Sequence, residues 1–336
     1  MRTSSLLALA VAFAVVAPAC GNWSNDELED LAFLDALPQP RDLSLDSPGA
    51  DEVTQGLACS GPTCERKQGL RVCAAGDQDL FCLGHGMVGN LNGLTYKLLA
   101  VLDTIRQLPP TTRKSDGRVW GPHPDDEHPG RRWMVTVDRT SSGAGYSYSW
   151  SVRLAPPRGD FVEIVSGAFF PGPGGTSRGT GSYTWDALTA RAHGLDPDGD
   201  DSFATLELRY DLVSDPKHIE ADVSATNGSV LSIESDRLTD GSGGWHYTVP
   251  LDVDGVGELE VIEARAQWQA DRAGRADALL TLGAGARFPP GPYGTTTCWS
   301  ATLERSFFDT DFQEACPPAG CPVGVEASCP FGFLLP

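Results

Sequence analysis

The stretch from His123 to His128 reads His-Pro-Asp-Asp-Glu-His and carries the side chains best suited to bind a metal ion. Imidazole nitrogens and carboxylate oxygens are ligands of catalytic zinc, and such a centre needs three protein ligands and one open position. The remaining histidines are scattered along the chain, at His85, His193, His218 and His246. We therefore interpret the stretch as an acidic surface loop, with adventitious metal binding as the alternative.

The same stretch resembles the HPDD zinc motif of the N-acetylglucosaminyl deacetylase family. By that resemblance, His123 and Asp126 would bind zinc and Asp125 would act as the base. In the family the motif follows an apolar parallel strand, whereas residues 114–121 are polar and turn-like, and no His-x-x-His pair follows. No catalytic residue is therefore assigned, and the chain is expected not to be an enzyme.

Two further stretches imitate functional motifs. Asp196, Asp198 and Asp200 alternate as oxygen ligands of Ca²⁺ do, but the stretch lacks the glutamate at the twelfth position that an EF-hand requires. Residues 175–179 match a nucleophile elbow, yet they follow a run of glycine and proline and precede a strand pattern. We predict that the three aspartates stand in a solvated turn, with calcium binding as the alternative. Residues 175–179 are predicted to form a hairpin loop. No cofactor is expected.

Cysteine usage indicates an oxidising compartment. The eight cysteines after Cys20 form an N-terminal and a C-terminal cluster, with none between residues 83 and 297: Cys59, Cys64, Cys73, Cys82, Cys298, Cys316, Cys321 and Cys329. An even number suggests four disulfides, formed within each cluster. Zinc half-sites at residues 59–64 and 316–321 are the alternative, although zinc usually takes a two-residue spacing. We predict that Cys298 pairs with Cys329, because the C-terminal tail would otherwise be free.

The N-terminus has the pattern of an export signal. Arg2 precedes an apolar run from Leu6 to Val16, which is too short to span a bilayer. Residues 16–20, Val-Ala-Pro-Ala-Cys, resemble a bacterial lipobox, which implies removal of residues 1–19 and lipidation of Cys20. Gly21 and Asn22 follow the cysteine, and by resemblance to Gram-negative sorting rules the absence of aspartate there implies the outer membrane.

Composition and charge exclude several classes of protein. The 336 residues carry 45 acidic and 25 basic side chains, a formal net charge of -20. Such a field repels phosphate backbones, so nucleic acid is not an expected partner. Hydrophobic residues at 40% suffice for a core, which excludes wholesale disorder.

Two helices are predicted before the first strand. Leu28, Leu31 and Leu34, with Phe33 and Leu37, give residues 25–38 an apolar side that ends at Pro38, within a lipidated tether over residues 20–70. A helix is then predicted over residues 90–108, before Pro109-Pro110. Apolar residues recur there at helical spacing, in a stripe that begins at Met87 and continues with Leu91, Leu94, Leu98, Val101, Leu102, Ile105 and Leu108. We expect this stripe to face the core, and Gly89 and Gly93 to weaken the beginning of the helix.

Beyond Trp120 the hydrophobic period is two. Alternation and turn residues, such as Asn227-Gly228 and Asp240-Gly241, predict strands at 133–139, 146–154, 161–170, 180–187, 203–212, 217–225, 229–238, 245–253, 257–270, 276–282 and 296–308. The predicted fold class is mainly β. Residues 71–336 are expected to form one domain, an antiparallel meander that curves or closes into a barrel. The helix lies on the apolar face of this sheet, and a disulfide-rich tail follows at the C-terminus. Trp133, Trp150, Trp245 and Trp299 fall on that face, and Trp268 does so if a bulge near Val261-Ile262 shifts the alternation.

The lipobox, the segment from Asn25 to Pro38, Trp120-Gly121-Pro122 and Thr297-Cys298-Trp299 together resemble a set of uncharacterised myxobacterial-type outer-membrane lipoproteins. The resemblance implies a location and a fold. We expect a non-enzymatic binding or structural module of the cell envelope, attached to the membrane by its N-terminal lipid, with a hydrophobic ligand or an envelope protein as partner. The alternative is a periplasmic lipid or lipoprotein carrier with an apolar cavity under the helix.

Overall fold

The computed structural model of the chain describes residues 25–48, 79–142, 145–173, 178–195, 203–252, 257, 259–282, 289–312 and 320–335. The helical elements are α1 (Asn25–Asp35), η1 (Pro40–Asp42), α3 (Leu80–Ile105), α4 (Ala187–Ala192) and η3 (Glu326–Ser328). The strands are β1 (Thr112–Arg113), β2 (Gly117–Pro124), β3 (Arg132–Ser142), β4 (Gly145–Ala155), β5 (Val162–Pro171), β6 (Gly179–Asp186), β7 (Phe203–Asp211), β8 (Lys217–Ala225), β9 (Val230–Arg237), β10 (Gly243–Leu251), β11 (Glu260–Trp268), β12 (Gly274–Leu282), β13 (Gly291–Trp299), β14 (Arg305–Thr310) and β15 (Val323–Gly324).

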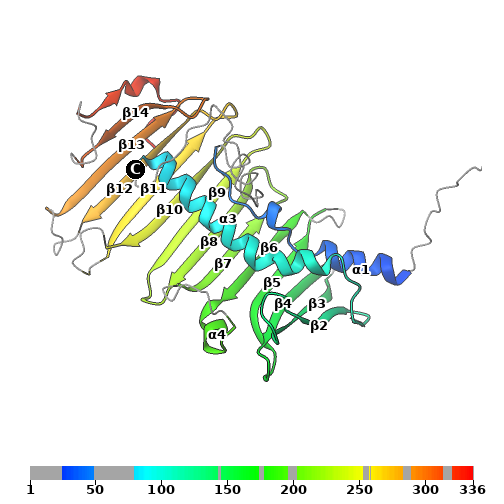
Figure 1. Cartoon of the computed structure of the whole chain (residues 1–336). Coiled ribbons are helices and arrows are strands. Elements are labelled where there is room, and N and C mark those ends of the chain that lie inside the picture. Colours follow the sequence, from blue (N-terminus) through cyan, green and yellow to red (C-terminus); the bar gives the residue numbers. More distant parts are fainter. Residues whose placement is uncertain are drawn as a thin grey trace, which may run out of the picture.

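The fifteen strands form one antiparallel sheet in which each strand pairs with its neighbours in sequence. The sheet does not close, since β1 and β15 stand at opposite ends of the strand order, so the predicted meander is confirmed as an open sheet and no barrel forms (Figure 1). Gly228, in the β8–β9 turn, has a φ of 86°, which glycine adopts without strain. The turn spans residues 226–228, closed by the hydrogen bond from Ala225 N–H to the Ser229 carbonyl, and is thus one residue longer than the two-residue turn expected from Asn227-Gly228.

Two strand predictions needed correction. The single strand expected at 296–308 is divided into β13 and β14, because residues 300–304 form a turn in which Leu303 N–H donates to the Ser300 carbonyl. The pairing of β10 with β11 runs without interruption from Gly243↔Trp268 to Leu251↔Glu260. Trp268 therefore reaches the same face as Trp245 without the expected bulge.

Helix α3 crosses one face of the sheet, which we call the covered face (Figure 1). It begins at Leu80, ten residues earlier than predicted, where the Asp79 side chain accepts a hydrogen bond from Phe81 N–H. Gly89 and Gly93, expected to weaken the beginning of the helix, lie within α3 and have open space around them, whereas Gly84 serves packing, since a Cβ there would lie 2.2 Å from the Trp245 ring. Tertiary contact with the sheet thus outweighs the low helix propensity of glycine.

The segment from α1 to Ser47 belongs to the core, although the sequence predicts a tether over residues 20–70. Phe33, Leu37, Leu43 and Leu45 are almost completely buried in the same cluster as the sheet and α3. Leu28 and Leu31, expected on the same apolar side of α1 as Phe33, are exposed instead. The boundary expected near residue 70 therefore does not separate residues 25–48 from the folded domain.

The predicted bridge between Cys298 and Cys329 is confirmed, with a Cα–Cα distance of 5.5 Å. It attaches the C-terminal segment, including η3, to β13 at the sheet end opposite α1. Cys82 and Cys321 each take part in a disulfide bond as well. None of the described helices combines the length and the apolar run needed to cross a bilayer.

Candidate binding surface

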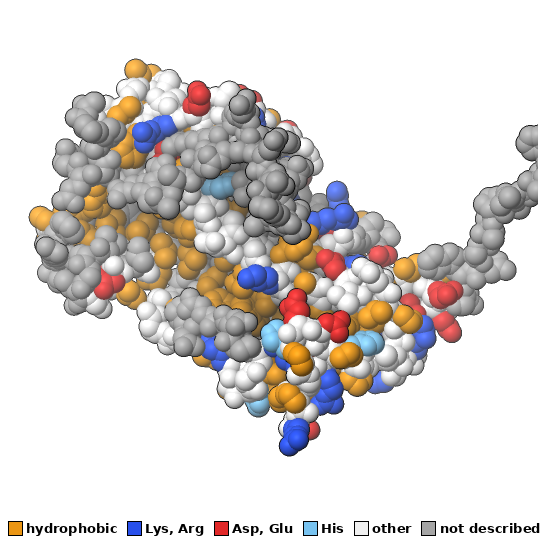
Figure 2. Space-filling view, viewed as in Figure 1, with side chains coloured by type: hydrophobic (Ala, Val, Ile, Leu, Met, Phe, Trp, Pro, Cys, Tyr) orange, Lys and Arg blue, Asp and Glu red, His pale blue; other side chains and the backbone are white. Residues whose placement is uncertain are grey.

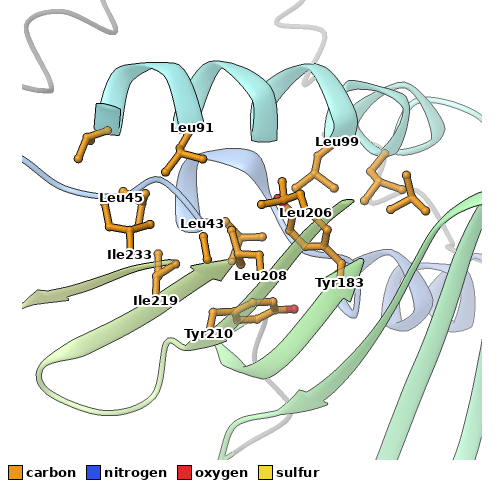
Figure 3. Close-up of a cluster of buried hydrophobic side chains, with 14 of the residues drawn as sticks. Leu43, Leu45, Leu91, Leu99, Tyr183, Leu206, Leu208, Tyr210, Ile219 and Ile233 are labelled. Carbon is orange, nitrogen blue, oxygen red and sulfur yellow. The ribbon is translucent and has the colours of Figure 1, made fainter. Parts of the chain in front are cut away.

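The side of α3 that faces the sheet is packed as a core. Figure 3 shows Leu91 and Leu99 of the helix above Leu206, Leu208 and Tyr183 of the sheet. Leu99 and Leu206 have no exposed surface, and Thr95 shares a hydrogen bond of 3.0 Å with the Tyr183 hydroxyl. Burial raises the pKa of Tyr183, so the phenol stays neutral in this contact. The middle of the helix therefore rests directly on the sheet.

One flank of α3 is closed by residues 36–48. Asn92 makes two hydrogen bonds to Leu45, accepting from the backbone N–H at 2.7 Å and donating to the carbonyl at 2.9 Å. Nearer the two ends of α3, His85 bonds to Ser47 at 2.9 Å and Arg106 donates to the carbonyls of Leu34 and Leu37. The contacts of Asn92 and Arg106 satisfy backbone groups of a segment that has little regular secondary structure between α1 and α3 beyond η1.

The same segment is attached to the sheet by charge. Asp46 forms ion pairs with Arg237 and, at 3.9 Å, with Lys217. Lys217 also donates to the Ser44 carbonyl. Lys217 and Arg237 are cross-strand partners at one end of the β8–β9 ladder, so the segment lies over that end of the strands.

The other flank of α3 is apolar, and we call it the open flank. It consists of Met87, Leu94, Leu98 and Val101, which are half-buried against the core. At 3.6 residues per turn these side chains point about 120–180° away from Asn92. Leu94 and Leu98, expected within the buried stripe, therefore lie at its margin, while Thr95 and Leu99 are buried at its centre.

The open flank faces the end of the strands that residues 36–48 leave uncovered. A line of inward-facing apolar residues crosses seven strands there, through the partners Trp185↔Leu206, Leu206↔Val223, Val223↔Leu231, Val249↔Ile262 and Ile262↔Leu280. Leu231 and Val249 stand one residue beyond the last β9–β10 pair, Ser232↔Thr248. We call this line the apolar row. Leu206 and Leu280 are buried, whereas the other five, Trp185, Val223, Leu231, Val249 and Ile262, are only half-buried.

We call the apolar row and the open flank together the trough, an apolar surface on the covered face. Figure 2 shows hydrophobic side chains gathered over this face, next to the helix. Six strand spacings of about 4.8 Å separate β6 from β12, so the row is about 29 Å long. The trough is thus long, apolar and free of charged side chains among the described residues that form it.

The opposite, outer face of the same strands is ionic. Arg209 of β7 binds Glu220 at 2.8 Å and Asp222 at 2.7 Å on β8. His218 bonds to Asp236 and Glu220; although burial lowers its pKa, these two carboxylates raise it by more, so the net shift is upward. The two faces differ enough in polarity that an apolar partner would select the covered face.

The structure places the His123–His128 stretch at the hairpin between β2 and β3. The His123 ring packs on Trp133 at a centroid distance of 4.6 Å. Asp125 accepts from the backbone of Glu127 and His128 and pairs with Arg131, which also donates to the Leu195 carbonyl. These contacts hold a turn together, and no cluster of three metal-ligating side chains occurs in the described ranges.

Several predicted site residues lie outside the described residues. These are Cys20, Cys59, Cys64, Cys73 and Cys316, the three aspartates Asp196, Asp198 and Asp200, and Ser177. The structure brings together Cys298 and Cys329 as predicted. The apolar row was not identified from the sequence, because its residues share the alternation of the fully buried rows beside it.

Comparison with known proteins gives no relative: no protein-family model, no curated protein and no solved structure matches the chain.

Proposed function

We propose that this chain is a cell-envelope lipoprotein, anchored by a lipid on Cys20, that acts as a non-enzymatic binding module for an elongated apolar ligand. The observation that carries the proposal is the trough, where five half-buried apolar side chains of the sheet lie opposite an apolar helix flank. Binding sites for small ligands are characteristically apolar and largely preformed. The export signal and the even number of cysteines after Cys20 support the location.

The trough favours a ligand with an extended hydrocarbon body. Its length of about 29 Å exceeds that of a compact metabolite, and burying apolar surface contributes about 25 cal/mol per Å². The net charge of -20 disfavours a strongly anionic ligand. Acyl chains have the required shape and polarity.

A carrier is the second candidate, because the same trough could hold an acyl chain in transit. Because the middle of α3 packs directly on the sheet, the chain in transit would lie along the open flank and not beneath the helix. A lipid on Cys20 favours a stationary binding protein, since an anchored chain does not diffuse between membranes. The state of Cys20 therefore separates the two candidates.

Lipidation of Cys20 is tested by replacing it with alanine. We expect Cys20→Ala to give unprocessed or soluble protein, because the lipid is the proposed link to the membrane. Mass spectrometry of the mature wild-type N-terminus should find a modified Cys20 as the first residue. An unmodified N-terminus beyond residue 20 would refute the anchor and favour a carrier.

Ligand binding is tested by filling the trough. Leu98→Trp adds a larger side chain to the open flank, and we expect it to weaken binding of an apolar fluorescent probe, N-phenyl-1-naphthylamine, about tenfold, or about 1.4 kcal/mol. The melting temperature should change little, because Leu98 is at the margin of the core. Ala100→Leu, on the exposed side of the same helix, is the matched control and should leave probe binding unchanged. Equal probe affinity in Leu98→Trp and wild type would contradict the proposal.

A further inference from the structure

Helix α1 has a second apolar side that does not face the core. Phe33 and Leu37, which follows the helix, are 0% and 1% exposed, whereas Leu28 and Leu31 are 54% and 38% exposed. Leu28 and Leu31 are three residues apart and therefore lie on one side of the helix. Ion pairs from Glu29 and Asp30 to Arg118 hold the opposite side on the sheet, so this orientation is fixed.

The second apolar side borders a groove of about 690 Å³, which we call the α1 groove. Its other wall is formed by the beginning of β4 and the end of β5, with Tyr146, Phe169 and Phe170. Tyr146 is 50% exposed and Phe170 is 54% exposed. Four large apolar side chains, two from α1 and two from the strands, thus project into solvent around one groove.

The N-terminal segment connects this groove to the proposed anchor. Only five residue steps separate Cys20 from Asn25, where α1 begins, so a lipid on Cys20 lies within about 18 Å of the helix. Leu28 is less than one helical turn farther along. A membrane that holds the lipid is therefore within reach of the α1 groove and its exposed side chains.

We propose that the α1 groove, with Leu28, Leu31, Tyr146 and Phe170 around it, is a membrane-contact surface that inserts into the interfacial region of the bilayer. The proposal rests on the lipid anchor proposed above. Leucine and aromatic side chains at a bilayer surface bury apolar area, and tyrosine suits the headgroup level.

The charges around the groove indicate which lipids it contacts. The guanidinium of Arg139 lies 4.5 Å from the Tyr146 ring, but its side chain is 14% exposed and is paired with Glu29 at 2.8 Å, so its charge is already neutralised within the protein. Asp35 lines the groove, and Asp26 and Glu27 stand in the first turn of α1. This acidic surround disfavours anionic membranes and fits zwitterionic phospholipids.

Membrane contact at the α1 groove sets the orientation of the whole sheet. α1 and β2–β5 lie at one end of the molecule, and β14 lies at the other (Figure 1). The α1 end would rest on the membrane, and the disulfide-bonded C-terminal end would project away from it. The trough beside α3 would then extend outward from the bilayer.

Photocrosslinking tests the contact. p-Benzoylphenylalanine is placed at position 170 or at position 333, where the native phenylalanines are 54% and 57% exposed at opposite ends of the molecule. Each protein is bound to phosphatidylcholine–phosphatidylethanolamine vesicles, irradiated and analysed by mass spectrometry. We expect phospholipid adducts at position 170 to exceed those at position 333 several-fold. Equal adducts at both positions, or protein dimers as the main product at position 170, would overturn the proposal.

A second form of the protein separates failure of the contact from failure of the anchor. In it a histidine tag replaces Cys20, and nickel-chelating lipid holds the chain on the same vesicles. Lipid adducts at position 170 in this form support the contact even if native Cys20 proves unmodified. Their absence in both forms overturns the contact, whatever the state of Cys20.

Discussion

Replacing Asp277 by alanine is expected to lower the free energy of unfolding by about 3–5 kcal/mol, the usual cost of removing one partner from a buried ion pair. Asp277 has no exposed surface, and its carboxylate lies 2.9 Å from Nε of Arg275, which is 3% exposed. It also accepts from the Thr296 hydroxyl at 2.6 Å and from the Leu334 backbone N–H at 2.8 Å. The substitution leaves a buried guanidinium and two donors without this acceptor.

Glu326→Ala is the control for Asp277→Ala. Glu326 also contacts Arg275, at 3.2 Å, but its side chain is 62% exposed. An ion pair exposed in this way contributes about 0–1 kcal/mol. Urea unfolding under oxidising conditions, which keep Cys298 bonded to Cys329, measures both variants. Similar losses in the two variants would contradict the role assigned to Asp277.

Asp30→Ala is expected to cost about 3 kcal/mol, because it removes the main partner of a buried arginine. The carboxylate of Asp30 lies 2.5 Å from Nε of Arg118, whose side chain is 2% exposed, and 2.8 Å from Arg113. Arg118 also lies over the Phe33 ring at 4.5 Å. Loss of this carboxylate should release α1 from β1–β3 before the rest of the sheet unfolds.

Hydrogen exchange of the α1 amides measures that release directly. We expect faster exchange in α1 and little change in the central strands of Asp30→Ala. Asp26→Ala, one turn earlier on the same side of the helix but exposed, should leave exchange and stability near the wild-type values. Unchanged exchange in α1 of Asp30→Ala would show that the ion pair does not hold the helix.

Much of the sheet could be predicted because each central strand has one face in water and one against the core. That arrangement produces alternation, as in residues 203–212 and 217–225, which correspond to β7 and β8. β2 was missed because Gly117, Gly121 and two prolines interrupt the pattern, and β15 is only two residues long. The turn within 296–308 was missed because apolar residues stand on both sides of it.

The helices show where local signals fail. Residues 80–89 contain three glycines, and propensity alone argues against a helix, but Gly84 provides the space that Trp245 needs. Residues 39–48 have the composition of a linker, yet Leu43 and Leu45 are buried and Asn92 binds the backbone of Leu45. Both cases depend on contacts between residues far apart in sequence, which no local pattern encodes.

The trough could not be predicted for a related reason. Val223 and Ala221 stand on the same face of β8 and fit the same alternation, but α3 runs diagonally and leaves only the end with Val223 partly exposed. The course of the helix, rather than the residue type, decides which row is core and which is available for binding. The His123–His128 stretch shows the opposite. Its residues have the types of metal ligands, but in the structure Asp125 binds Glu127 N–H and Arg131 and stabilises a turn.

The most direct test of the binding proposal is the amount of apolar ligand that the protein retains from its own cells. Wild type, Leu98→Trp and Ala100→Leu are purified alike, and organic extracts are quantified by mass spectrometry as moles of lipid per mole of folded protein, with lipid covalently bound at Cys20 excluded. We predict bound acyl-chain lipid in wild type and Ala100→Leu, and a clear loss in Leu98→Trp at an unchanged melting temperature. Equal lipid in all three proteins, or none in wild type, would contradict a ligand-binding trough beside α3.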